Sequence, residues 1–183
     1  MIILGIDPGT LVTGYGVIET RNGKTEILAF GAIKNDSGRP MPLRLKRIYD
    51  KLNEVLAVHR PDECAIETAF YGKNAQSALK LGQARGVAML AAIVHDIPMS
   101  EYSPREVKKA LVGNGTASKQ QVQYMIRSVL GFKKISEKFD VSDALAVAVC
   151  HLHRLSKPKS AYPSWKGFIT AHPERVSIPK KIR

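Results

Sequence analysis

The first 33 residues decide the fold class, and they read MIILGIDPGTLVTGYGVIETRNGKTEILAFGAI. Ile2–Asp7 is a short apolar run that ends at Pro8-Gly9, and Thr13–Thr20 is rich in β-branched residues and glycine. Asn22-Gly23 lies between that run and Thr25–Ile33, and this dipeptide between two apolar runs is a strong hairpin signal. We therefore predict three consecutive strands that pair as an antiparallel meander.

After Pro40 the spacing of the apolar residues changes from that of strands to that of helices. The predicted order continues as a helix up to Pro61, a strand over Cys64–Ala69, a helix over Asn74–His95, a strand over Ile97–Tyr102, and helices over Pro104–Leu111, Ser118–Leu130 and Asp140–Ser156. Strands that alternate with helices are joined by parallel crossovers. The sequence therefore predicts an α/β fold: a mixed sheet in which an antiparallel meander leads into parallel βαβ units, with flanking helices.

The length and composition exclude several classes of protein. The chain has 183 residues, enough for one domain plus an appendage, and no run approaches the roughly 18 apolar residues of a membrane span. No signal-peptide pattern precedes the first strand. Two cysteines, Cys64 and Cys150, are too few for a disulfide framework and show no metal-type spacing. We expect a cytoplasmic protein with no membrane partner.

The charge points to a polyanionic partner. Lys and Arg number 28 against 16 Asp and Glu, a formal net charge of +12. Nucleic acid fits this surplus best, an anionic membrane surface fits it less well, and simple solubility remains an alternative. Residues 157–183 carry seven Lys or Arg, one acidic residue and four prolines. We therefore predict one domain over residues 1–156 and an irregular or disordered basic tail over residues 157–183.

Two carboxylates lie where burial makes them costly. Asp7 ends the first predicted strand, and Glu67 interrupts the otherwise apolar or small run from Cys64 to Phe70. Alternation along that strand places Glu67 on the face of Ala65, which is too small to shield a charge. Each has a plainer explanation, because Asp7 can organise the turn at Pro8-Gly9 and Glu67 can emerge into solvent at the strand end.

A second pair of carboxylates, Asp140 and Asp143, begins the last predicted helix. They are three residues apart, so their side chains project from one helix face. Capping and the helix dipole explain one aspartate well, but the second less well because the rest of the helix is mostly apolar.

Together these four carboxylates predict a metal centre. The carboxyl ends of strands converge at one edge of an open sheet, where a packed helix can add its first turn. Four carboxylates this close repel one another unless multivalent cations neutralise them, and hard oxygen ligands select Mg²⁺ or Mn²⁺. Two such ions about 4 Å apart can activate water and stabilise the leaving oxygen of a phosphodiester. In a basic protein, this set indicates a nuclease.

An ordered series of motifs resembles one family. Gly5-Ile6-Asp7-Pro8-Gly9-Thr10 with Thr13-Gly14-Tyr15-Gly16 resembles the opening of the RuvC Holliday-junction resolvases. The resemblance continues over about residues 1–155 through Ala65-Ile66-Glu67 with Phe70, Lys73-Asn74-Ala75, the run from Ser77 to Gly86, Val107-Lys108, Lys119 and the run from Asp140 to Ala146. It implies an RNase H-like fold and a Mg²⁺-dependent endonuclease that cuts two strands of a four-way DNA junction symmetrically.

The same resemblance implies roles for individual residues and partners. By position, Asp7, Glu67, Asp140 and Asp143 match the catalytic metal ligands of the family, although some members have His in place of Asp140. Phe70 matches an aromatic that stacks on junction bases, and Lys108 and Lys119 match lysines that hold DNA near the scissile phosphate. A homodimer and cooperation with the RuvA–RuvB branch-migration complex are also implied. The small residues of Ala75–Ala92 suit a dimer interface or packing on the chain's own sheet.

The residues alone support these three DNA contacts less sharply. Phe70 lies beside polar residues, where it can stack on an unpaired base for about 1–3 kcal/mol, or it can cap the core. Lys119 falls in the first turn of a helix, where free N–H groups also favour phosphate, yet a solvated helix face explains Lys108 and Lys119 too. His151 and His153 point in different directions from one helix, and we interpret them as structural.

Three other classes remain as alternatives. The first hairpin also resembles the phosphate-handling hairpin of actin-like ATPases and sugar kinases, but these need two such domains and no second hairpin of this kind follows. An RNase H-like nuclease of the YqgF type, acting on RNA, shares the hairpin. A non-catalytic DNA-binding module explains the charge but not the four carboxylates.

Overall fold

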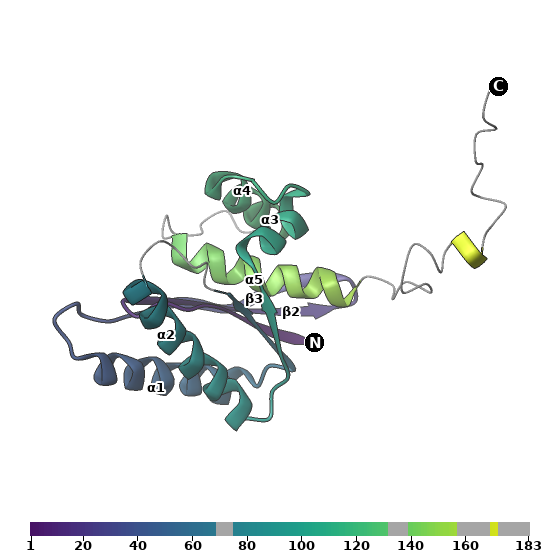
Figure 1. Cartoon of the computed structure of the whole chain (residues 1–183). Helices are drawn as coiled ribbons and strands as arrows, with labels where there is room; N and C mark the ends of the chain where they lie inside the picture. Colours follow the sequence, from purple (N-terminus) through teal and green to yellow (C-terminus); the bar gives the residue numbers. More distant parts are fainter. Residues whose placement is uncertain (69–74, 132–138, 157–168, 172–183) are drawn as a thin grey trace, which may run out of the picture.

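A five-stranded sheet with helices on both faces forms the body of the molecule (Figure 1). The computed structural model describes residues 1–68, 75–131, 139–156 and 169–171, and the side chains of residues 139 and 140 are not described. Helices α1 (Met41–His59) and α2 (Ala75–Val94) cover one face of the sheet, and α5 (Phe139–Leu155) covers the other. Helices α3 (Pro104–Val112) and α4 (Lys119–Val129) pack on α5.

The sheet is mixed, as predicted. Its strands are β1 (Ile2–Asp7), β2 (Val12–Arg21), β3 (Lys24–Lys34), β4 (Glu63–Glu67) and β5 (Met99–Tyr102), in the order β3-β2-β1-β4-β5. The first three pair antiparallel, while β4 is parallel to β1 and β5 is parallel to β4. Strand β1 is therefore central, with the meander on one side and the crossover units on the other.

The predicted hairpin turn is present between β2 and β3. Asn22 and Gly23 both adopt positive φ, 53° and 77°, as a two-residue turn between twisted strands requires. The boundaries of two other predicted strands are slightly wrong. Strand β4 ends at Glu67 and not at Ala69, which lies outside the described residues, and β5 begins at Met99 because Pro98 has no N–H to donate to the ladder.

The predicted helix over Ser118–Leu130 is shorter in the structure because its end residues are caps. Ser118 accepts a hydrogen bond from the Gln121 backbone, and the Gln121 side chain accepts one from the Ser118 backbone. Ser103 and Glu106 form the same reciprocal capping box at the start of α3. These two boxes fix where α3 and α4 begin, and both helices lie over α5.

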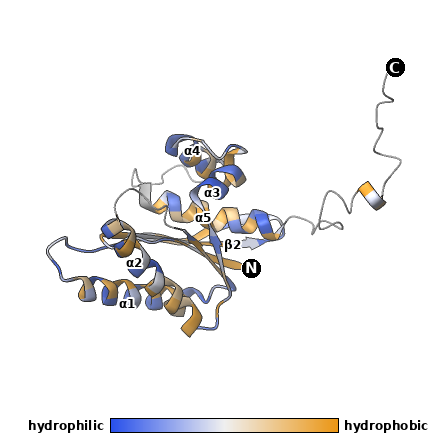
Figure 2. Cartoon of the chain, in the orientation of Figure 1, coloured by the Kyte–Doolittle hydropathy of each residue, from blue (hydrophilic) through white to orange (hydrophobic). Residues whose placement is uncertain are grey.

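Two apolar cores lie on opposite faces of the sheet. Ile3, Ala65 and Tyr102 contact the core beneath α3, α4 and α5, whereas Leu4 and Ile66 contact the core beneath α1 and α2. This alternation between faces is the period of two expected for a sheet buried on both sides. The strand next to the N label is coloured hydrophobic in Figure 2 for the same reason.

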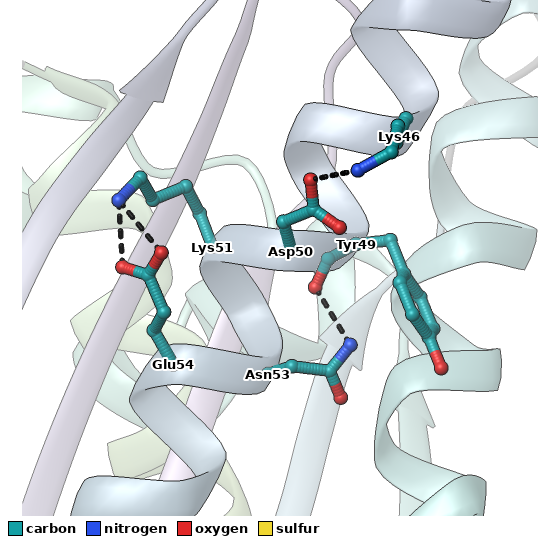
Figure 3. Close-up of polar contacts among 6 residues, drawn as sticks. All are labelled: Lys46, Tyr49, Asp50, Lys51, Asn53 and Glu54. Carbon is teal, nitrogen blue, oxygen red and sulfur yellow. Dashed lines mark hydrogen bonds and ion pairs between the residues drawn. The ribbon is translucent and has the colours of Figure 1, made fainter.

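The outer face of α1 is a solvated surface. Lys46 pairs with Asp50 at 2.7 Å and Lys51 pairs with Glu54 at 2.6 Å (Figure 3). Exposed pairs of this kind contribute only about 0.3–0.5 kcal/mol each. The Asn53 amide donates to the Tyr49 carbonyl oxygen, as Figure 3 also shows, and its oxygen bonds to a ring nitrogen of His95 at 2.8 Å. The last contact ties α1 to the end of α2.

Helix α2 is apolar on two faces. Within the described part of the chain it is the one helix long and apolar enough to cross a membrane, by length and composition alone. Its buried alanines, Ala84, Ala88, Ala91 and Ala92, belong to the core beneath α1 and α2, so one side of α2 packs against the rest of the domain. Its outward side still exposes large apolar side chains, namely Leu79, Leu90, Ile93 and Val94.

Candidate active site

Asp7 and Glu67 lie at the carboxyl ends of adjacent parallel strands. The last paired residues of β1 and β4 are Ile6 and Ile66, and each carboxylate follows directly. Asp7 shares its strand face with Ile3, and Glu67 shares its face with Ala65, and both of these residues contact the core beneath α5. The two carboxylates therefore project toward the same helix, as the sequence predicted.

Close packing of α5 on β1 brings a third carboxylate to this edge. A Cβ added to Gly5 would lie 2.2 Å from the Ala144 carbonyl oxygen and 2.7 Å from the Ala148 nitrogen. A Cβ on Gly16 would lie 2.6 Å from a Leu145 methyl carbon. The helix therefore rests on two glycines, and its residue Asp143, next to Ala144, lies beside the strand ends.

A short fixed loop follows Asp7. The Thr13 hydroxyl, fully buried, donates to the Gly9 carbonyl oxygen at 2.7 Å and accepts from the Gly9 nitrogen at 3.3 Å. A Cβ on Gly9 would lie 2.3 Å from the Val12 carbonyl oxygen, so only glycine fits there. These contacts hold the loop after β1 in one conformation and fix the position from which Asp7 projects.

A cavity of about 270 Å³ joins five of the seven predicted site residues. The three carboxylates Asp7, Glu67 and Asp143 and the two lysines Lys108 and Lys119 line it. Its remaining walls come from Pro104, Val107, Val122 and Ala146. Sequence reasoning did not assign these apolar residues to the site. The capping sequences at Ser103 and Ser118, which place the first turns of α3 and α4, could have found Pro104, Val107 and Val122.

The carboxyl groups in this cavity disfavour one another's ionised forms. Burial, the nearby charge of Asp7 and the nearby charge of Asp143 raise the pKa of Glu67 from 4.5 to about 8, against the opposing effect of Lys119 and Lys108. The Lys119 ammonium lies 3.2 Å from a carboxylate oxygen of Asp143, and Asp143 is the main cause of a raised Lys119 pKa. With all three carboxyls ionised, the site would carry more negative charge than its two lysines neutralise.

Two predicted site residues are not placed. Phe70 lies outside the described residues. Asp140 belongs to the first turn of α5, three residues before Asp143, but its side chain is not described. Within the described residues no group of three or more His, Cys, Asp or Glu side chains is arranged as a metal site.

The histidines and cysteines noted in the sequence lie away from this cavity. His151 is buried and bonds through Nδ1 to the Tyr102 hydroxyl at 2.7 Å, which agrees with its interpretation as structural. His153 bonds to the Ala110 carbonyl oxygen. Cys64 and Cys150 are buried and form no disulfide, and burial raises the pKa of Cys64 to about 12, so that thiol is not a reactive thiolate.

The chemistry of the donor set fits divalent metal ions. Asp7, Glu67 and Asp143 present only carboxylate oxygens, which hard cations such as Mg²⁺ and Mn²⁺ prefer. A bound cation would favour the ionised form of Glu67 and so oppose the effects that raise its pKa. The lysines at the opposite wall can neutralise a phosphate of a polyanionic substrate. This arrangement suits hydrolysis of a phosphodiester.

Comparison with known proteins points the same way. The family model described as crossover junction endodeoxyribonuclease RuvC matches residues 3–151. A protein of that name from Salinibacter ruber is 46% identical over 178 residues, covering 97% of this chain and 99% of the relative. One from a Shewanella species is 51% identical over 152 residues, covering 83% and 87%.

A solved structure is similar over most of the fold. It is described as Thermus thermophilus RuvC in complex with a Holliday junction substrate, and it is 35% identical with a TM-score of 0.80. The match covers 85% of this chain and 94% of that one.

Proposed function

The chain belongs to the RuvC family of crossover junction endodeoxyribonucleases, and from this we propose that it resolves four-way (Holliday) DNA junctions in homologous recombination and DNA repair. The predicted RNase H-like fold is confirmed by the likeness to RuvC structures. The observation that carries the proposal is the cavity in which Asp7, Glu67 and Asp143 face Lys108 and Lys119. Carboxylates for a metal and cations for a phosphate are what a phosphodiesterase of this family needs in one place.

We propose that Asp7, Glu67, Asp140 and Asp143 hold the metal, two Mg²⁺ ions per site, which Mn²⁺ can replace. When bound, such ions supply an activated water and stabilise the charge on the leaving oxygen. The raised pKa of Glu67 supports its part in this set, because a buried carboxyl beside two others gains most from a cation. Asp140 enters the set through its place in the first turn of α5, three residues before Asp143.

The lysines act on the substrate. Lys108 and Lys119 approach the cavity from α3 and α4, across from the strand ends. We propose that they bind the nonbridging oxygens of the scissile phosphate and its neighbour. Lys119 also holds Asp143 in place, at 3.2 Å, before metal binds. Phe70, three residues beyond Glu67, is proposed to stack on an unpaired base at the crossover.

We propose a homodimer formed through α2. The exposed residues Leu79, Gln83, Gly86, Leu90 and Ile93 follow alternating spacings of four and three, the pattern of a helix-pairing seam. A Cβ added to Gly86 would meet nothing within 4 Å, so this side of the helix is open to a partner. A two-fold dimer presents two identical sites to the two equivalent strands of a junction, which gives symmetric cuts.

Two further parts of the proposal rest on family membership alone. Cooperation with the RuvA–RuvB branch-migration complex and a cytoplasmic location are both expected of a RuvC relative. No described residue argues for the YqgF-type RNA nuclease or for a non-catalytic module, so these remain outcomes that the experiment separates.

The test incubates purified protein with a labelled four-way junction, a linear duplex of the same sequence and a structured RNA, with Mg²⁺ and with chelator. We expect paired nicks in the junction only, and only with metal. Asp7→Asn is expected to abolish cutting while junction binding persists, because binding depends on phosphate neutralisation. Cutting of RNA, or cutting unchanged by Asp7→Asn, would contradict the proposal.

A further inference from the structure

The outer face of α4 has no assigned role. Val122 and Ile126 bury the inner face against the core beneath α5, while Gln120, Tyr124 and Arg127 are exposed on the opposite side. The Tyr124 residue is 72% exposed. A large aromatic residue so exposed on an otherwise polar helix face suggests a contact with something outside the monomer.

The charge of α4 identifies the kind of partner. The helix sequence KQQVQYMIRSV contains two basic residues and no acidic residue. Helix α3 uses Glu106 in its capping box, whereas α4 uses the neutral Gln121 in the same position. Figure 2 colours much of α4 hydrophilic. Lys119 faces the cavity, so the outer face itself carries one arginine, one glutamine and the exposed tyrosine. These side chains suit a sugar–phosphate backbone, which takes its hydrogen bonds from Arg, Gln and Tyr.

The outer face begins one residue after Lys119, while Val122 on the buried side of α4 lines the catalytic cavity. Lys119, the first residue of α4, lines that cavity and reaches Asp143. From Gln120 to Arg127 the helix advances about 10 Å at roughly 1.5 Å per residue. That distance corresponds to about three base pairs, since the strand advances roughly 3.4 Å for each phosphate.

We propose that the outer face of α4, formed by Gln120, Tyr124 and Arg127, binds the backbone of the junction arm that leaves the cavity, over the first few phosphates beyond the cut. This inference rests on the proposed function, because it assumes that a junction strand occupies the cavity. Arg127 supplies positive charge, and the Tyr124 hydroxyl and the Gln120 amide donate hydrogen bonds to phosphate oxygens. The face sets the direction in which that arm leaves the protein.

A second basic region is weaker as a DNA contact. Lys109, His153 and Arg154 line a groove between α3 and α5. These residues lie in the last turns of the two helices, where the carbonyl ends already attract cations. Arg127 likewise lies in the last turn of its helix, so what distinguishes α4 is the exposed aromatic side chain of Tyr124 beside that arginine.

The test is a double-mutant cycle that combines amino-acid substitutions in the protein with neutralised phosphates in the DNA. Junction binding is measured in an Asp7→Asn background, which prevents cutting, for Arg127→Gln, Tyr124→Phe and Tyr124→Ala. A neutral methylphosphonate replaces one phosphate at a time on either side of the cut. Arg21→Gln is the matched control, since the Arg21 side chain is 80% exposed at the far hairpin.

We expect Arg127→Gln to weaken binding about 5–10-fold and to lower the salt slope by about 0.9. Neutralising the phosphate that Arg127 contacts should weaken wild-type binding but not Arg127→Gln binding. Tyr124→Phe, which cannot disturb the helix, should lose part of what Tyr124→Ala loses. Arg21→Gln should match wild type.

The outcomes separate this inference from the proposed function. Wild-type affinity and wild-type phosphate sensitivity in all the α4 variants, in a protein that cuts junctions, would overturn the α4 surface and leave the nuclease intact. A protein that neither binds nor cuts junctions would overturn both. If Arg21→Gln weakened junction binding as much as Arg127→Gln does, the effect would come from the net charge of the protein and not from the α4 face. That result would also overturn the inference.

Discussion

Gly5 of β1 and Ala144 of α5 touch backbone to backbone, so that a Cβ built on Gly5 would lie 2.2 Å from the Ala144 carbonyl oxygen. Asp7 follows Gly5 by two residues, and Asp143 precedes Ala144 by one. The separation of the sheet and the helix at this contact therefore controls how near these carboxylates of the site lie to each other. A residue with no side chain sets the geometry of the acidic cluster.

The first prediction is that Gly5→Ala is strongly destabilising. The added methyl meets helix backbone that cannot rotate away, so α5 must move, and overpacking of this kind costs about 1–3 kcal/mol or more. Cutting should fall further than the loss of folded protein explains, because Asp143 moves with the helix. Urea unfolding and cutting per folded molecule measure the two effects. Gly38→Ala is the control, since its Cβ would meet one atom at 3.6 Å. Equal stability of the two variants would contradict this.

The second prediction compares neighbouring lysines. Lys108 lines the carboxylate cavity, whereas Lys109 lines the groove on the other side of α3. Lys108→Met should lower the rate of junction cutting about 100-fold, a usual cost of removing a group that stabilises transition-state charge. Lys109→Met should leave the rate within about twofold. Single-turnover cutting at saturating protein checks this, and similar rates for both variants would show that Lys108 acts only through net charge.

The third prediction concerns pH. The pKa of Glu67 is raised to about 8 in the folded, metal-free protein, so the folded state binds one more proton than the unfolded chain between about pH 4.5 and 8. The free energy of unfolding contributed by this group is therefore greatest below pH 4.5 and is lost as the pH rises through 8, by a few kcal/mol. Urea unfolding in chelator from pH 5 to 9 measures it.

Two controls isolate Glu67 in that experiment. Glu67→Gln should flatten the decline, and Glu54→Gln, on the exposed face of α1, should not. Mg²⁺ should weaken the decline in the wild type, because a bound cation favours the ionised carboxylate. A wild-type curve that rises from pH 5 to 9 in chelator would contradict a raised pKa for Glu67.

Much of the fold could be predicted because its signals are local. Asn22-Gly23 marks the hairpin, and Asp7 and Glu67 stand out because each ends an apolar strand. Their proximity follows from parallel strands meeting at one edge. Asp143 was predicted from its spacing within one helix. Each of these inferences needs only the period of a strand or a helix.

The remaining features depend on contacts between distant segments. The role of Gly5 appears only when α5 crosses β1, since a glycine in a strand also signals a bulge. The pairing of Lys119 with Asp143 needs α4 to lie over α5. Tyr124 carries no sequence signal, because one aromatic among polar residues does not alter the helical period.

The fourth prediction tests the proposed dimer. Leu90 is exposed in the seam of α2, so Leu90→Lys should separate the subunits without unfolding them. Sedimentation velocity should show monomer, and the variant should lose simultaneous cutting of both strands while single nicks persist. Val58→Lys is the control, because Val58 is 74% exposed on α1, outside the seam. A dimeric Leu90→Lys protein would place the interface elsewhere.

The fifth prediction concerns the tail, residues 157–183, whose seven basic residues and one acidic residue give it half of the net charge. We expect its removal to weaken junction binding and to lower the salt slope by about 0.9 for each lysine or arginine that contacts phosphate. The rate of cutting at saturating protein should be unchanged, because no group proposed to act at the cavity lies beyond α5. Binding titrations from 50 to about 200 mM salt measure the slope. An unchanged slope would mean that the tail's charge does not meet DNA, and its seven cations would then need another partner.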